Sequence, residues 1–272
     1  MRSRLLLTMG VTAAICVCSH VTANAQEAQP HKWTAQEVAE ALVDPAATIS
    51  YFNVSYRNYQ DVGPKDDKTN QEYRLNGAGF FNLSNGSSIF YRAFLPFYDN
   101  KFPVDKSGVG DALLSAYWVP TKGSVILGYG AALIAPTASE DFFGTGKWSA
   151  GPTIVIAKKE PGVYTVGGLV THVWSFAGDS DRENVSITTI QPALTVFLNK
   201  KGTSVSLTSE TTYNWEASKD PWQIPATVAI GQILPPFGKS FVGVGLAYSY
   251  YLEKNDLAPD WDVRAVLSIV FP

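Results

Sequence analysis

The sequence predicts an all-β fold, an antiparallel transmembrane β-barrel of about 12 strands that follows a short N-terminal helix. Three observations predict it: long runs of alternating apolar and polar residues, connections that alternate between short and long, and an N-terminal export signal. Beyond that signal, no stretch approaches the ~18 to 20 consecutive apolar residues that a membrane-spanning helix needs. Closed barrels cross membranes with strands of about 9 to 11 residues, whose signal is alternation alone.

The composition of the chain limits its class. Of the 272 residues, 46% are hydrophobic and 17% are charged. This length suffices for one large all-β domain or two ordinary domains. Because charge is scarce and aromatic residues are plentiful, the chain fits neither a disordered protein nor a nucleic-acid-binding surface, and we expect no nucleic-acid partner.

Residues 1–25 predict a secretory signal peptide. Both cysteines, Cys16 and Cys18, lie inside it, so the exported chain would be cysteine-free. Cys18 would also suit a lipid anchor, but Val17 before it is larger than the small residue usual there, and cleavage near Ala25 is preferred. The signal consists of Arg2 and Arg4, the apolar run from Leu5 to Val17, and the small-residue motif from Ala23 to Ala25.

Residues 26–47 predict a periplasmic segment that contains a short helix over residues 33–43. Thr34 and Glu37 have the spacing of a capping box, and Pro45 follows the expected end. The helix is too short and too polar to cross a membrane. We expect it to lie against the periplasmic end of the barrel or to plug the opening there.

Residues 48–272 predict the barrel itself, because strand-like runs repeat to the C-terminus. Their number is even, as it is in bacterial outer-membrane barrels. The runs span residues 48–59, 70–83, 87–98, 109–119, 123–136, 146–158, 162–176, 184–198, 202–216, 222–233, 239–252 and 260–271.

The connections between these runs alternate in length. Short turns on one side and long loops on the other are typical of outer-membrane barrels, with the short turns in the periplasm. The tight connections, rich in turn residues, are 84–86, 120–122, 159–161, 199–202 and 235–238, and the longer ones are 60–70, 99–108, 137–146, 177–183 and 253–259.

The run over residues 202–216 shows the alternation most clearly. One parity carries Val205, Leu207 and Tyr213, which we expect to face lipid, and Trp215, which we expect at the outer interface. The other carries Glu210, Asn214 and Glu216, which we expect to point into the lumen. A soluble sandwich or lipocalin would instead bury the apolar parity, and any single strand permits that alternative. The number and length of the strands, the loop asymmetry and the export signal together favour the membrane barrel.

Several short motifs along the chain are similar to those of one known family. Together they resemble the outer-membrane transporters named for the meta-pathway of phenol degradation, over about residues 36 to 272. The motifs are Leu42 to Ala47, Gly108 to Asp111, Ala135 to Ser139, Val173 to Asp179, Gln191-Pro192, Asn214 to Ala217, Pro259 to Trp261 and the terminal Phe271-Pro272.

This resemblance implies an outer-membrane β-barrel of a Gram-negative bacterium, described as a transporter and linked by name to the catabolism of aromatic compounds. The expected partners are outer-membrane lipid, a small-molecule solute, and the barrel-assembly machinery, which would bind the C-terminal strand. No family-wide catalytic or binding residues are carried over, so the strand pattern must supply any site.

The polar parity predicts a set of lumen-lining side chains of both charges. Two interpretations stay open: a network that fills and rigidifies a narrow barrel, or charges that select the solutes that pass. We expect Arg74 to neighbour Arg92 or Glu72, and Asp262 to neighbour Glu72 or Arg264. The set is Arg57, Glu72, Arg74, Asn76, Arg92, Asp111, Ser115, Gln191, Glu210, Asn214, Glu216, Asp262 and Arg264.

Enzymatic readings find little support in the sequence. His172 is the one barrel histidine available as a general base, with Ser175 or Ser209 as a nucleophile, and the phase of its strand leaves open which face it takes. The acidic pairs Asp66-Asp67 and Asp179 with Asp181 are interpreted as solvated loop residues. We therefore expect no catalytic residues, no metal site and no cofactor.

The predicted function is passive passage of a small aromatic or otherwise hydrophobic solute through the barrel. The alternative is a non-transport barrel with a structural or docking role, its helix serving as a periplasmic contact. A third possibility, a lipid-modifying enzyme, would depend on His172.

Overall fold

A computed structural model describes residues 31–65, 67–120 and 123–272 of the chain. The predicted signal peptide lies outside the described residues. The chain divides into two units, and the second, Trp33–Pro272, is compact and contains the fold presented below.

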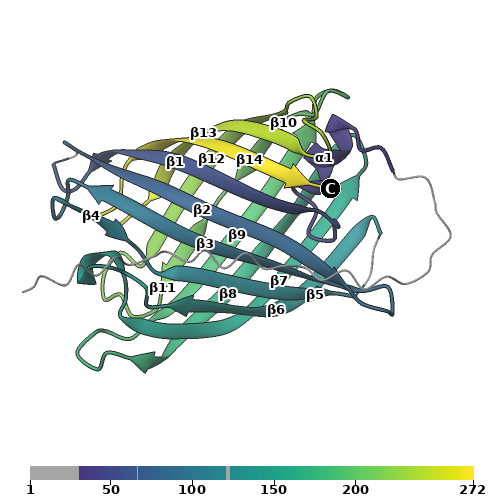
Figure 1. Cartoon of the computed structure of the whole chain (residues 1–272). Helices are drawn as coiled ribbons and strands as arrows, with labels where there is room; N and C mark the ends of the chain where they lie inside the picture. The colour runs from purple at the N-terminus through teal and green to yellow at the C-terminus, as the bar shows by residue number, and fades with distance from the viewer. Residues whose placement is uncertain (1–30, 66, 121–122) are drawn as a thin grey trace, which may run out of the picture. The chain divides into compact units, whose positions relative to one another are not determined.

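The second unit is a closed antiparallel β-barrel of 12 strands, as the sequence predicts (Figure 1). It closes because the first strand pairs with the last along its whole length. Each predicted run matches an observed strand to within three residues at each end. The segments are β1 (Ser50–Val62), β2 (Lys68–Asn82), β3 (Ser88–Asn100), β4 (Lys106–Val109), β5 (Ala112–Val119), β6 (Val125–Ala135), β7 (Lys147–Glu160), β8 (Tyr164–Gly178), β9 (Ser186–Phe197), β10 (Thr203–Thr208), β11 (Thr211–Asn214), β12 (Trp222–Ile233), β13 (Phe241–Glu253) and β14 (Trp261–Phe271).

Fourteen segments make 12 strands because two strands are interrupted. β4 and β5 both pair with β3, and β10 and β11 both pair with β9 and β12. The register places Pro192 across from Ser209 on one side and Pro225 across from Glu210 on the other. Proline has no N–H to donate to a ladder, so regular pairing is interrupted at Ser209 and Glu210, where the Ser209 N–H still donates to the Pro192 carbonyl at 3.1 Å. The sequence predicts a continuous strand here.

The outer face of the barrel is apolar. Mid-strand side chains such as Leu207 on β10 and Leu246 on β13 are 57% and 65% exposed, whereas inward neighbours such as Ser249 are buried. Exposed apolar side chains recur on every long strand, which far exceeds the isolated patches of a water-soluble surface. The polar parity therefore faces the interior, the reverse of a soluble sandwich or lipocalin.

The helix α1 (Ala35–Ala41) has Thr34 as its N-cap, and both hydrogen bonds of the predicted capping box between Thr34 and Glu37 form. Its buried Val38 packs against inward-facing side chains at the tight-turn end of the barrel, near the C-terminus (Figure 1). Those side chains are Ile49, Phe197, Ile233, Phe241 and Val270. Of the two expected positions, the structure thus places the helix in the opening.

Two polar contacts hold the helical segment to the turn between β7 and β8. Glu40 Oε1 accepts a hydrogen bond from the Gly162 backbone N–H at 2.9 Å, and Asp44 forms an ion pair with Lys159. Among the described residues, no helix has the length and apolar character needed to cross a membrane.

We predict that Leu246→Arg lowers the free energy of unfolding in lipid vesicles by about 2–4 kcal/mol, because it places a charge at mid-strand on the apolar outer face. Leu257→Arg, in the loop after β13 where the side chain is 55% exposed, is the control and should have little effect. Urea titration of the refolded barrel measures both. Equally small effects would contradict a lipid-facing outer surface.

Candidate functional site in the barrel lumen

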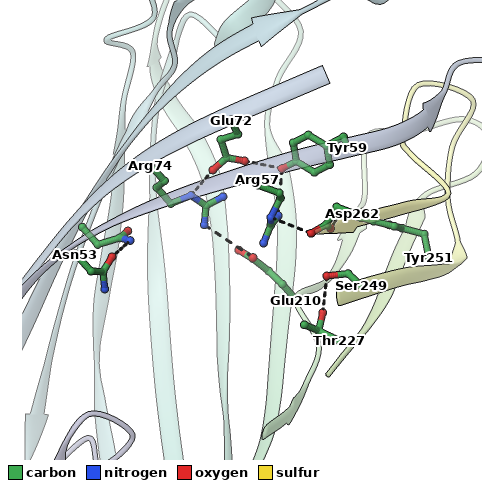
Figure 2. Close-up of polar contacts among 11 residues, drawn as sticks. Asn53, Arg57, Tyr59, Glu72, Arg74, Glu210, Thr227, Ser249, Tyr251 and Asp262 are labelled. Atoms are coloured by element: carbon green, nitrogen blue, oxygen red, sulfur yellow. Dashed lines mark hydrogen bonds and ion pairs between the residues drawn. The ribbon is translucent and has the colours of Figure 1, made fainter. Parts of the chain in front are cut away.

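A charged cluster forms where β1, β2 and β14 lie side by side. The strand register places Arg57 directly across from Glu72 on one neighbour and from Arg264 on the other. Like charges in directly opposed positions repel. The Arg57 guanidinium instead forms an ion pair with Asp262, with Nε 3.5 Å from Oδ1 (Figure 2).

Glu72 is the buried centre of this cluster. Its Oε1 lies 2.5 Å from Arg74 Nε, and its Oε2 accepts a hydrogen bond from the Tyr59 hydroxyl at 2.5 Å. Tyr59 in turn accepts a hydrogen bond from Arg57 Nη1 at 3.1 Å. A buried carboxylate is tolerated when both oxygens are satisfied in this way, so the wall of β1 and β2 is held as one network.

An ion pair from this network crosses the lumen. Arg74 Nη1 on β2 lies 4.0 Å from Oε2 of Glu210, which sits at the interruption between β10 and β11. Around the barrel, β2 and the interrupted strand of Glu210 are far apart in both directions. One path between them crosses β1, β14, β13 and β12, and the other crosses β3, β5, β6, β7, β8 and β9. Arg74 and Glu210 therefore reach toward each other from opposing walls (Figure 2).

The expected partners of Asp262, Glu72 or Arg264, are not the groups that it contacts. Its ion pair is with Arg57, and its second oxygen accepts a hydrogen bond from the Tyr251 hydroxyl at 3.1 Å. Arg57 faces Arg264 in the register, so its guanidinium turns toward the carboxylate two residues along β14. Of the two neighbours expected for Arg74, Glu72 is the one that contacts it.

Two cavities meet at the cross-lumen ion pair. Cavity A has a volume of about 360 Å³ and reaches toward β12 and β13, where Thr227 and Tyr251 line it. Cavity B has a volume of about 560 Å³ and reaches toward β5–β9, where Ser115 and Ile187 line it. The residues that line both are Arg74, Tyr98, Gln191, Glu210 and Arg264.

A long loop folds inward over cavity B. It carries a short 3₁₀ helix, η1 (Asp141–Phe143), and the Phe143 ring stacks on Tyr98 with centroids 5.5 Å apart. Asp111 fixes the loop, because its two oxygens accept hydrogen bonds from the backbone N–H groups of Ala138 at 3.2 Å and Thr145 at 2.7 Å. Asp111 thus holds this loop, residues 136–146, in place and also lines the cavity. We call it the constriction loop.

The other predicted lumen residues divide between the cavities and a loop. Asn76, Arg92 and Gln191 line cavity B. Asn214 lies at the end of β11, where its Oδ1 accepts a hydrogen bond from the backbone N–H of Glu216 at 3.1 Å. Glu216 itself is an exposed loop residue.

The sequence analysis missed the tyrosines that complete the network. Tyr59 links Arg57 to Glu72, and Tyr251 binds Asp262. Tyr59 lies two residues after Arg57, and Tyr251 lies two residues after Ser249, so both point inward like those neighbours. Parity could therefore have identified them.

His172 faces outward, which settles the face that the sequence left open. Its ring lies beside Trp174 and Trp215, with centroids 5.4 and 6.5 Å away, and its Nδ1 is 2.9 Å from Thr188 Oγ1. The hydroxyl of Ser175 accepts a hydrogen bond from the Val185 N–H instead. The structure thus gives His172 a contact with neither serine considered as a nucleophile.

No metal-binding cluster of three or more His, Cys, Asp or Glu side chains occurs in the described part of the chain. In the loop after β8, the Asp179 carboxylate accepts a hydrogen bond from the backbone N–H of Asp181 at 2.9 Å, as in a local turn. Asp66 lies outside the described residues.

No family model and no curated protein match the chain. Among solved structures, an outer membrane channel from Pseudomonas putida F1 is similar at a TM-score of 0.65 with 18% identity, over 84% of this chain and 98% of that chain. The NanC porin is similar at a TM-score of 0.55 with 9% identity, over 82% of this chain and 99% of that chain. These likenesses show that the fold is that of outer-membrane barrels, while the family named for phenol degradation stays a prediction.

We predict that Glu72→Gln lowers the free energy of unfolding by about 3–5 kcal/mol, because it removes the buried carboxylate that pairs with Arg74 and accepts the hydrogen bond of Tyr59. Glu210→Gln is the matched control, and its cost should be about 0–1 kcal/mol because the Glu210 side chain is 40% exposed. Urea unfolding of the two variants in the same vesicles compares them. Equal losses would contradict the assignment of Glu72 as the centre of the network.

Proposed function

We propose that the protein is a passive channel of the Gram-negative outer membrane for a small aromatic or otherwise hydrophobic solute. The proposal rests on one observation: the interior of a barrel with an apolar exterior contains a series of solute-sized cavities. The likeness of the fold to an outer membrane channel and a porin supports it. Solute would move down its own gradient, with no cofactor and no energy coupling.

The cavities form a series along the lumen. At the long-loop end, a cavity of about 230 Å³ shares Tyr59, Tyr98 and Gln223 with cavity A. Cavity B in turn shares Arg92 with cavity C, of about 300 Å³, which borders residues 41–45 beside α1. A solute would therefore pass the Arg74–Glu210 ion pair, then Arg92, and then the helical segment.

The same segment favours a second candidate function. Because α1 packs into the tight-turn opening, the barrel could be a closed structural or docking element that presents the helix to a partner. In either case, we propose that outer-membrane lipid surrounds the apolar face and that the assembly machinery engages β14.

The two functions predict different conductance. We expect the purified barrel to give a low ion conductance in planar bilayers and to let small aromatic solutes cause liposome swelling. The double variant Glu40→Ala/Asp44→Asn removes both polar contacts that hold the helical segment to the β7–β8 turn. Its conductance should rise severalfold, because α1 then leaves the opening more often.

Lys200→Ala, in the exposed turn between β9 and β10, is the control and should conduct like the wild type. Folding of each variant is checked by heat-modifiable mobility on a gel. If the wild type and the double variant are both folded and neither passes ions or solutes, the channel function is refuted. The second candidate, a structural or docking barrel, is then favoured.

A further inference from the structure

Cavity B has two walls of different character. One wall, from β2, β3 and β14, carries three arginines, and the other, from β5, β6, β8 and β9, carries apolar side chains alongside threonines, Ser115 and Gln191. The volume of about 560 Å³ lies in the usual range for small-molecule sites. The basic side chains are Arg74, Arg92 and Arg264, and the apolar ones include Leu113, Ala132, Ile134, Val173 and Ile187.

The three arginines follow one another along the lumen. Through the strand register, Arg264 aligns with Arg57 of β1, Arg74 aligns with Ser55, and Arg92 aligns with Tyr51. At about 3.3 Å per residue, this arginine row extends roughly 20 Å along the strand direction. Because Arg74 and Arg264 line cavities A and B, and Arg92 lines cavities B and C, the row connects all three.

Two members of the arginine row form no ion pair with the described residues. Arg92 Nε donates to Ser115 Oγ at 3.1 Å and its guanidinium lies 4.9 Å from the Phe94 ring centroid. Arg264 Nε is buried without a hydrogen-bond partner. Within the described residues, no carboxylate lies within ion-pair distance of either guanidinium.

The two carboxylates of cavity B are already engaged. Glu210 forms the ion pair with Arg74, which also holds Glu72. Asp111 accepts three hydrogen bonds from the constriction loop, two of them from Thr145. The cavity is lined by three arginines and two carboxylates, so it carries one positive side chain in excess, and such charge in a partly buried site favours a bound anion.

We propose that the lumen selects small organic carboxylates with an apolar body, the carboxylate passing along Arg264, Arg74 and Arg92 while the hydrocarbon part contacts the apolar side chains of β5, β6, β8 and β9. This inference rests on the proposed channel function and names its solute class. A carboxylate suits the guanidinium groups, which form paired hydrogen bonds with it. An aromatic or branched hydrocarbon suits the facing wall, which an inorganic anion would leave unused.

Block of the chloride current tests the solute class with three probes. Benzoate has both the charge and the apolar body, benzamide lacks the charge, and acetate lacks the ring. We expect benzoate to block at concentrations at least about tenfold lower than either of the others, since a hydrogen bond to a charged group accounts for about this factor. Equal block by benzoate and benzamide would overturn the proposal while leaving the channel intact.

Substitutions in the arginine row locate the effect. Arg92→Gln and Arg264→Gln should each raise the half-blocking benzoate concentration about tenfold, whereas Arg264→Lys, which keeps the charge, should raise it less. Lys239→Gln, in the exposed turn between β12 and β13, is the charge-matched control and should change nothing. Unchanged benzoate block in both glutamine variants, with folding verified by heat-modifiable mobility, would refute the assignment.

If the barrel carries no current, the proposed channel function is refuted. The solute class is then tested by binding instead. Isothermal titration of benzoate and benzamide into the detergent-solubilised wild type and the same variants gives that readout. Preferential binding of benzoate, weakened in Arg92→Gln and Arg264→Gln, would support the anion site even in a non-conducting barrel. Absence of benzoate binding would refute it.

Discussion

The ion pair between Arg74 and Glu210 is the constraint on which the interior depends. It joins opposing walls, and it marks the boundary between cavities A and B. Glu72 fixes its Arg74 end through a buried contact of 2.5 Å, whereas its Glu210 end is longer and partly exposed. An exposed pair contributes about 0–1 kcal/mol, so Glu210 can separate from Arg74 at little cost while the wall network stays intact.

The backbone explains why Glu210 occupies this place. Pro192 and Pro225 flank it on both neighbouring strands and interrupt the ladder where the carboxylate enters the lumen. The arginine row of β2, β3 and β14 lines one side of cavity B, and most of its apolar side chains come from β5, β6, β8 and β9 on the other. The Asp111-anchored loop lines the same cavity, so the proposed selection by charge would act beside this loop.

The fold could be predicted from the sequence because strand alternation has a period of two and needs no knowledge of strand pairing. Leu207 outward and Glu210 inward follow from parity alone. The partner of Asp262 could not be predicted in this way, because it depends on the register that brings Arg57 opposite Arg264. The interruption at Ser209 and Glu210 is also a register effect, since the two prolines responsible lie on other strands. Tyr59 and Tyr251 needed only parity, but interfacial tyrosines are common enough in barrels to obscure them.

The most direct test of the cross-lumen ion pair is a double-mutant cycle on single-channel conductance, with Arg74→Gln, Glu210→Gln and the combined variant. If the pair restricts the lumen, each single substitution raises the conductance, and the combined variant conducts about as well as the better single one. If the effects of the two substitutions simply add, or neither changes the conductance, Arg74 and Glu210 do not act together across the lumen.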